Sequence, residues 1–178
     1  MEKYMLPTGK ELIIREARKS DAQRLIDYVN AISYESDFLT FGPGEFNIPI
    51  EKEERFIEES YNTKNKLFLV AQIQGRIVGN LSFAGGQRPR IKHSGEFGIS
   101  VLKEYWGQGI GSRLILYLIQ WCKESGEIRK VNLSVREDNV RAIKLYERLG
   151  FKKEGKISRT FYINGQFYAA IVMGLEID

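Results

Sequence analysis

The stretch YWGQGIGSRLI, residues 105–115, places three glycines, Gly107, Gly109 and Gly111, on alternate positions between two apolar runs. A predicted strand stops at Leu102, and a predicted helix begins near Gly111. The first N–H groups of a helix lack internal partners, and the helix dipole adds positive potential there. Because glycine has no Cβ, its backbone can approach a ligand closely. The stretch therefore predicts a backbone cradle for a phosphate or pyrophosphate group.

Two common phosphate-binding motifs do not fit this loop. A P-loop ends in Gly-Lys-Ser/Thr, whereas this chain has Gly-Ser-Arg at residues 111–113. The dinucleotide-binding motif needs a glycine where Ser112 stands, and it needs a strict alternation of strands and helices that the chain lacks. From the loop alone, a tight turn that packs a helix on a sheet remains the alternative.

Hydrophobic periodicity predicts one mixed α/β domain over residues 1–178. Gln-Gly at 74–75 and Asn-Gly at 164–165 are signals of β-hairpins. Strands are expected over residues 11–16, 66–73, 76–86, 94–102, 130–135, 151–163 and 166–177, and helices over 22–33, 49–62, 111–125 and 139–150. In the second helix, Ile50, Phe56, Ile57 and Tyr61 are expected to share the buried face.

Composition narrows the function classes. The net charge of +4 is spread along the chain and mixed with acidic runs, so no nucleic-acid partner is expected. One cysteine, Cys122, lies on an apolar helix stripe and is expected to be a buried, inert thiol. With one histidine and one cysteine, no metal site is expected. No apolar run approaches the ~20 residues of a membrane span, and no signal peptide is evident, so the expected location is the cytoplasm.

Two further motifs join the glycine loop: GEFGISV, residues 95–101, and NVRAIKLYERLGF, residues 139–151. With them the sequence resembles the GNAT N-acetyltransferase superfamily over almost the whole chain, and looks closest to the phosphinothricin-type and ribosomal-protein N-terminal acetyltransferases. The superfamily signature, Gln/Arg-x-x-Gly-x-Gly/Ala, falls on Trp106, Gly109 and Gly111, with Trp106 departing from the usual first residue.

The resemblance implies a central, mostly antiparallel sheet of about seven strands with one splayed pair, and about four helices. It also implies acetyl-CoA as co-substrate, with no metal. The loop backbone would wrap the pyrophosphate, and the pantetheine arm would add to the strand at 94–102 like an extra strand. The implied cofactor-binding residues are Ile99, Ser100, Val101, Trp106, Gly107, Gln108, Gly109, Ile110, Gly111, Ser112, Asn139 and Tyr146.

Two residues are candidates for proton transfer. Glu96 stands where the phosphinothricin-type enzymes carry a glutamate, and could accept the ammonium proton as general base. A solvent-facing carboxylate paired with Lys92 is the alternative, and His93 is a competing base. Asn139 and Tyr146 are two helical turns apart and line one side of the helix. The resemblance implies that Tyr146 donates a proton to the coenzyme sulfur and that Asn139 contacts the pantetheine. Otherwise Asn139 is a plain helix cap and Tyr146 a core aromatic.

The acceptor site is expected between the early loop and the terminal hairpin. Its predicted aromatic wall consists of Tyr34, Phe38, Phe41, Phe46, Tyr162 and Phe167. Glu35 and Asp37 could attract a cation. The resulting expectation is direct acetyl transfer, in a ternary complex, to a primary amine of a small molecule or a peptide or protein N-terminus. The alternatives are a non-catalytic acyl-CoA-binding or regulatory module, and a protein or RNA partner with a vestigial loop. The terminal hairpin could pair in a homodimer.

Overall fold

Eight strands form one sheet in the order β1-β2-β3-β4-β5-β6-β8-β7 in the computed structural model, which describes all 178 residues. The strands are β1 (Glu2–Met5), β2 (Glu11–Glu16), β3 (Lys66–Ile73), β4 (Arg76–Gly85), β5 (Ser94–Val101), β6 (Lys130–Arg136), β7 (Lys152–Ile163) and β8 (Gln166–Glu176). Neighbouring strands are antiparallel except β5 and β6, which are parallel. The predicted class, a mostly antiparallel sheet with four helices, is confirmed.

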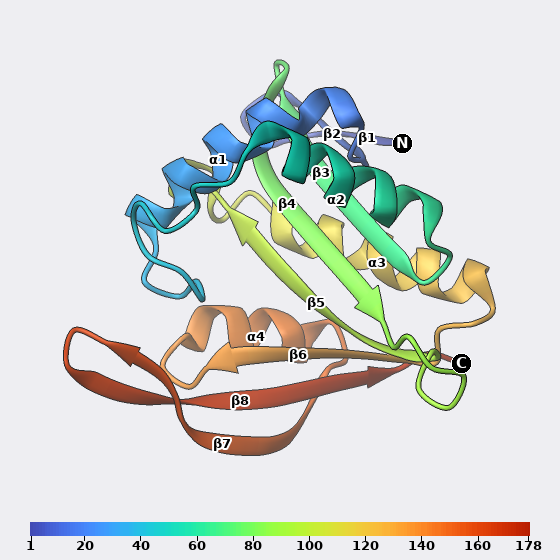
Figure 1. Ribbon diagram of the computed structural model, residues 1–178, viewed down its shortest axis with the longest axis vertical. Coiled ribbons are helices and arrows are strands. Elements are labelled where there is room, and N and C mark those ends of the chain that lie inside the picture. Colours follow the sequence, from blue (N-terminus) through green and yellow to red (C-terminus); the bar gives the residue numbers. More distant parts are fainter.

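Four helices cover the two faces of this sheet (Figure 1). They are α1 (Ala22–Glu35), α2 (Ile50–Asn62), α3 (Ile110–Ser125) and α4 (Val140–Arg148), with short 3-10 turns at Lys19–Asp21 and Lys103–Tyr105. Helices α1 and α2 lie on one face, and α3 and α4 lie on the other. No helix is long and apolar enough to cross a membrane.

Turn residues set the hairpins and helix ends as predicted. Gln74 and Gly75 have φ of 49° and 79°, and Asn164 and Gly165 have φ of 51° and 79°, as a two-residue hairpin turn of the primed type requires. Gly150 follows α4 with a φ of 94° and ends the helix in the left-handed region.

The buried face of α3 anchors the core. Leu114, Ile115, Leu118 and Cys122 are each at most 1% exposed within a cluster of 36 buried residues. Burial raises the pKa of the Cys122 thiol to about 12, so the thiol stays protonated at neutral pH. The predicted buried thiol is confirmed.

Two predictions about the elements were wrong. Strand β1 was missed because it has only four residues with alternating exposure and no apolar run. In α2 the buried positions are Glu53, Ile57 and Ser60, two of them polar. Tyr61 is therefore exposed to 71%, and the apolar pattern misplaced the packed face.

The parallel pair β5–β6 opens into a split. The two strands pair only over Ser94–Glu96 and Lys130–Asn132. At the last pair, the Asn132 side-chain amide donates to Ser94 Oγ at 3.0 Å and to the Gly95 carbonyl at 3.2 Å. Beyond it, β5 and β6 diverge toward the α1 side of the molecule (Figure 1). The splayed pair lies where the sequence predicts it, between the strands that flank α3.

At the far edge of the sheet, β7 is exposed along most of its length and pairs only with β8. Pairing of this hairpin across a homodimer stays a prediction.

Candidate active site

The glycine loop between β5 and α3 is held in a conformation that favours glycine. Gly107 and Gly109 have φ of 80° and 81°, in the left-handed region. Gly109 is also the N-cap of α3. Gly111 has an ordinary helical backbone, but a Cβ there would lie 3.4 Å from Leu145 Cδ2 of α4. The turn thus requires Gly107 and Gly109, whereas a Cβ at Gly111 would make an ordinary van der Waals contact with α4.

This loop offers a row of unused donors. None of the backbone N–H groups from Gly107 to Ser112, which include Gln108 and Ile110, donates to another group of the protein. The N-terminus of the 16-residue helix α3 lies among them and adds its dipole. The arrangement fits a pyrophosphate or another anion of similar size.

The edge of β5 that faces the split carries unpaired main-chain groups. The Leu102 N–H donates to the Val78 carbonyl at 2.9 Å, so even-numbered residues of β5 direct their main chain toward β4. The alternation turns the main chain of Ile99 and Val101 toward the split, beyond the last pair with β6. A ligand with amide groups can add there like a short strand.

Ser100 lies differently from its two neighbours. Its main chain faces Asn80 of β4, and its hydroxyl donates to Asn80 Oδ1 at 2.8 Å. With that proton used, Ser100 Oγ accepts from the Tyr28 hydroxyl of α1 at 2.8 Å. These two hydrogen bonds connect β5 to α1 and to β4, on the side away from the split.

Trp106 takes up one of the edge carbonyls. Its indole Nε1 donates to the Val101 carbonyl at 2.7 Å. The guanidinium of Arg141, in the first turn of α4, lies 4.7 Å from the centre of the Trp106 ring. The residue that departs from the superfamily signature therefore braces the glycine loop against β5 and holds a cation beside it.

Tyr146 of α4 packs against β5 on the α3 side of the sheet. It is 7% exposed and packs edge-on against Phe97 and Phe151, with ring centres 6.0 Å away in both cases. Burial raises its pKa to about 12, so its hydroxyl is a proton donor at neutral pH. Asn139 caps the same helix, its Oδ1 accepting from the Ala142 N–H at 3.2 Å.

Glu96 lies on the opposite face of β5 from Phe97. It is the last residue of β5 paired with β6, and its carboxylate makes no hydrogen bond or ion pair with the protein. The alternative pairing with Lys92 is not formed, since Lys92 pairs with Glu127. The competing base His93 lies outside the cavity that Glu96 lines.

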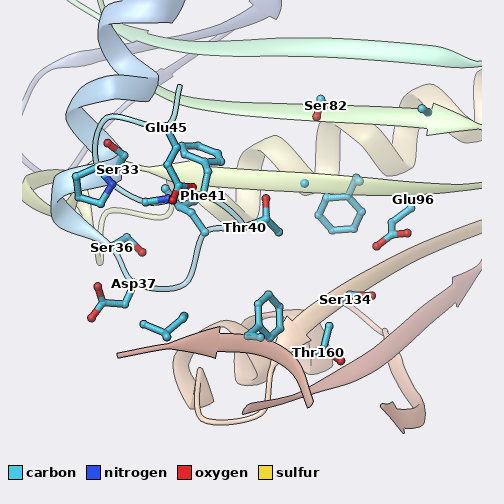
Figure 2. Close-up of a pocket in the computed structure, with 18 of the residues that line it drawn as sticks. Ser33, Ser36, Asp37, Thr40, Phe41, Glu45, Ser82, Glu96, Ser134 and Thr160 are labelled. Atoms are coloured by element: carbon cyan, nitrogen blue, oxygen red, sulfur yellow. Dashed lines mark hydrogen bonds between the residues drawn. The ribbon is translucent and has the colours of Figure 1, made fainter. Parts of the chain in front are cut away.

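That cavity has a volume of about 800 Å³ and lies between the α1–α2 loop, residues 36–49, and the ends of β4 to β7. Figure 2 shows Asp37, Thr40, Phe41 and Glu45 of the loop on one side, and Glu96, Ser134 and Thr160 across from them. Three carboxylates line it, those of Asp37, Glu45 and Glu96, against the single cation of Lys66. The excess of negative charge in the cavity suits a cationic ligand.

Only part of the predicted acceptor wall lines this cavity. Phe41 and Tyr162 do, whereas Tyr34 is 74% exposed outside it. Phe46 packs against Phe41, Phe38 lies over the Arg136 guanidinium, and Phe167 packs against Tyr162. Of the predicted acidic pair, Asp37 lines the cavity, but Glu35 turns away and accepts from the Lys103 N–H at 2.9 Å.

Other lining residues escaped the sequence analysis. Glu45 was missed, and so were the aromatic residues Phe56, Phe83, Phe97 and Phe161. They come from the α1–α2 loop and from α2, β4, β5 and β7, and no local spacing connects them. Only the three-dimensional fold brings them to one cavity. No group of three metal-ligating side chains lies together anywhere in the structure.

Comparison with known proteins identifies the family. Residues 32–151 match the model of the acetyltransferase (GNAT) family. The L-amino acid N-acetyltransferase AaaT of Escherichia coli is 36% identical over 105 residues, which are 59% of this chain and 65% of that protein, just under two thirds of its length. An N-alpha-acetyltransferase of Sulfurisphaera tokodaii is 30% identical over 89% of this chain and 90% of that protein.

A solved structure agrees with both relatives. The acetyltransferase of the GNAT family from Streptococcus pneumoniae has a TM-score of 0.91 to this chain at 34% identity, covering 94% of this chain and 99% of that one. A GNAT match over two thirds of the chain, a full-length relative and a shared fold all point the same way. The chain therefore belongs to the acetyltransferase (GNAT) family and is an acetyl-CoA-dependent N-acetyltransferase.

Proposed function

We propose that this chain acetylates the primary amine of a small cationic molecule or of a peptide or protein N-terminus, by direct attack in a ternary complex. The observation that carries the proposal is the placement of a carboxylate and a phenol on opposite faces of β5, Glu96 on one and Tyr146 on the other. Glu96 lies on the α1 face of β5 where pairing with β6 ends, and Tyr146 packs on its neighbour Phe97 from the other face. A donor and an acceptor entering from opposite faces would meet between them.

On the α3 side, the chain would hold the coenzyme mainly with its backbone. The free N–H groups of Gly107–Ser112 would bind the pyrophosphate, and Arg141 adds a positive charge beside them. The pantetheine arm would pair with Ile99, because Trp106 already occupies the Val101 carbonyl. A main-chain N–H at this edge would polarise the thioester carbonyl.

On the α1 side, Glu96 would accept the proton that the amine loses as the new C–N bond forms. As the C–S bond breaks, Tyr146 would donate its proton to the departing sulfur. The raised pKa of Tyr146 keeps the proton available at neutral pH. Both groups are chemically competent without a metal or a covalent acyl-enzyme.

The acceptor class follows from the cavity. Asp37 and Glu96 have carboxylates without partners in the protein, and Glu45 lies close by. An acceptor with a second positive charge would be attracted there, and the aromatic side chains would cover its apolar part. The proposal includes a cytoplasmic, reducing setting, in which a free thiol such as Cys122 persists.

The test combines steady-state kinetics with a pair of variants. Varying acetyl-CoA and amine together should give intersecting double-reciprocal lines, since both substrates must be bound before transfer. Glu96→Gln should lower kcat about 100-fold and flatten the rise of rate with pH, whereas His93→Asn should leave both nearly unchanged. Parallel lines would exclude direct attack, and an unchanged pH profile in Glu96→Gln would remove Glu96 from the role of base.

A further inference from the structure

A buried arginine joins the two sides of the split. Arg136, the last residue of β6, is only 7% exposed. Its Nε and Nη2 donate to the two carboxylate oxygens of Asp138 at 2.6 and 2.9 Å. Its remaining terminal nitrogen, Nη1, crosses the split and donates to the Asp37 carbonyl of the α1–α2 loop at 2.8 Å.

Two rings complete the surroundings of this guanidinium. The Phe38 ring centre lies 4.3 Å from Arg136 Cζ, and the Tyr168 ring centre lies 4.4 Å from it. Phe38 belongs to the α1–α2 loop and Tyr168 to β8. A planar guanidinium can make the fork to a carboxylate, a third hydrogen bond and ring contacts together, which an ammonium cannot.

Leu39, Phe41 and Phe46 of the α1–α2 loop pack against the core, and the bond from Arg136 is the loop's one hydrogen bond to the other side of the split. The α1–α2 loop hangs from the β1–β5 side, whereas Arg136, Asp138 and Tyr168 belong to the β6–β8 side (Figure 1). Between them β5 and β6 are unpaired. The loop supplies Asp37, Leu39, Thr40, Phe41 and Glu45 to the cavity, and Asp37 carries the very carbonyl that Arg136 binds.

We propose that Arg136 is the positioning residue of the α1–α2 loop, and that by holding Asp37 and Phe38 across the split it sets the affinity and selectivity for the acceptor amine. The inference rests on the proposed function, since it assigns the cavity to the acceptor. The Arg136 side chain contacts neither the glycine loop nor the edge of β5, and it meets the coenzyme side only through Asp138, next to Asn139. We therefore expect coenzyme binding to depend on this side chain much less than acceptor binding does.

The experiment compares Arg136→Lys with the wild-type protein. Lysine keeps the charge but loses the fork and the ring stacking, so the loop should loosen. Limited chymotrypsin digestion with mass spectrometry should show cleavage after Phe38 and Phe41 at least fivefold faster, relative to cleavage in the exposed hairpin at Tyr162. The KM for 1,4-diaminobutane should rise about tenfold. The Kd for coenzyme A, measured by calorimetry, should stay within twofold.

Two more variants serve as a substitute for Arg136→Lys and as a control. If Arg136→Lys fails to fold, Phe38→Ala removes one exposed ring of the same contact. This variant should be cleaved several-fold faster after Phe41, and its KM for 1,4-diaminobutane should rise several-fold. Arg148→Lys, an exposed arginine of α4 without an ion pair, should change nothing.

Unchanged loop cleavage in a folded Arg136→Lys protein, or a parallel rise of the coenzyme Kd, would overturn the proposal. If the wild-type protein does not acetylate 1,4-diaminobutane, the small cationic acceptor of the proposed function fails, and the digestion result alone still decides whether Arg136 holds the loop.

Discussion

The two sides of the split are built in different ways. On the side that we assign to the coenzyme, the free groups are mainly backbone N–H and C=O groups of one continuous segment, from Ile99 to Ser112. On the side that we assign to the acceptor, the cavity is lined by side chains from the α1–α2 loop, β4, β5, β6 and β7. A backbone site tolerates side-chain change provided that the glycines remain. A side-chain site changes its ligand with each substitution. One fold can thus keep its coenzyme and exchange its acceptor.

The largest expected effect falls where the two sides meet. Tyr146→Phe should lower kcat about 100-fold and leave the Kd for acetyl-CoA within twofold, because in the proposed mechanism the hydroxyl acts only as the sulfur leaves. Since burial raises the pKa of Tyr146 to about 12, the wild-type kcat should show no loss from this group up to about pH 10. Single-turnover kinetics and calorimetry measure the two quantities; an equal loss in both would make Tyr146 a packing residue only.

A smaller effect is expected from the loop backbone. Gly109→Ala should weaken coenzyme A binding about tenfold, because alanine resists the left-handed φ of 81° that aligns the N–H groups. A Cβ at that position meets nothing within 4 Å, so crowding is not the cause. Gly155→Ala, a site with equal space and an ordinary φ, is the control for calorimetric titration. Wild-type affinity in Gly109→Ala would contradict a backbone cradle.

The smallest expected effect is on the KM for the acceptor amine, without a change in coenzyme binding. Asp37→Asn should raise the KM for a diamine about threefold at low salt and less at high salt, since the carboxylate is exposed and screened. The coenzyme Kd should not move. Glu35→Gln, whose carboxylate faces the Lys103 N–H and not the cavity, is the matched control. Equal effects of the two variants would mean general surface charge and not a site.

The sequence predicts features that depend on neighbouring residues better than features that depend on residues distant in the chain. The glycine loop, the hairpin turns and the helix faces of α3 and α4 depend on neighbours within a few residues, so local patterns predict them. The prediction of the buried face of α2 was wrong because tertiary packing buries two polar residues, Glu53 and Ser60. The four-residue strand β1 is held by β2 and not by its own pattern.

The acceptor cavity shows the limit most clearly. Arg136 and Asp37 are distant in the chain, and no spacing predicts that a guanidinium will hold that carbonyl. Phe161 and Glu45 likewise line the same cavity as Glu96 only in the folded chain. Trp106 was visible as a departure from the signature, but its bond to Val101 required the three-dimensional path of the chain.

The most direct test of the account is a mass-spectrometric assay of the wild-type protein with acetyl-CoA and a pool of amines. The pool contains diamines, polyamines, neutral aliphatic amines, amino acids and short peptides. The account predicts that amines with a second positive charge, or peptides with a free N-terminus, gain one acetyl group while free coenzyme A is released. Release of no coenzyme A with any amine, from a protein that binds acetyl-CoA, would contradict it and favour a binding module on the same fold.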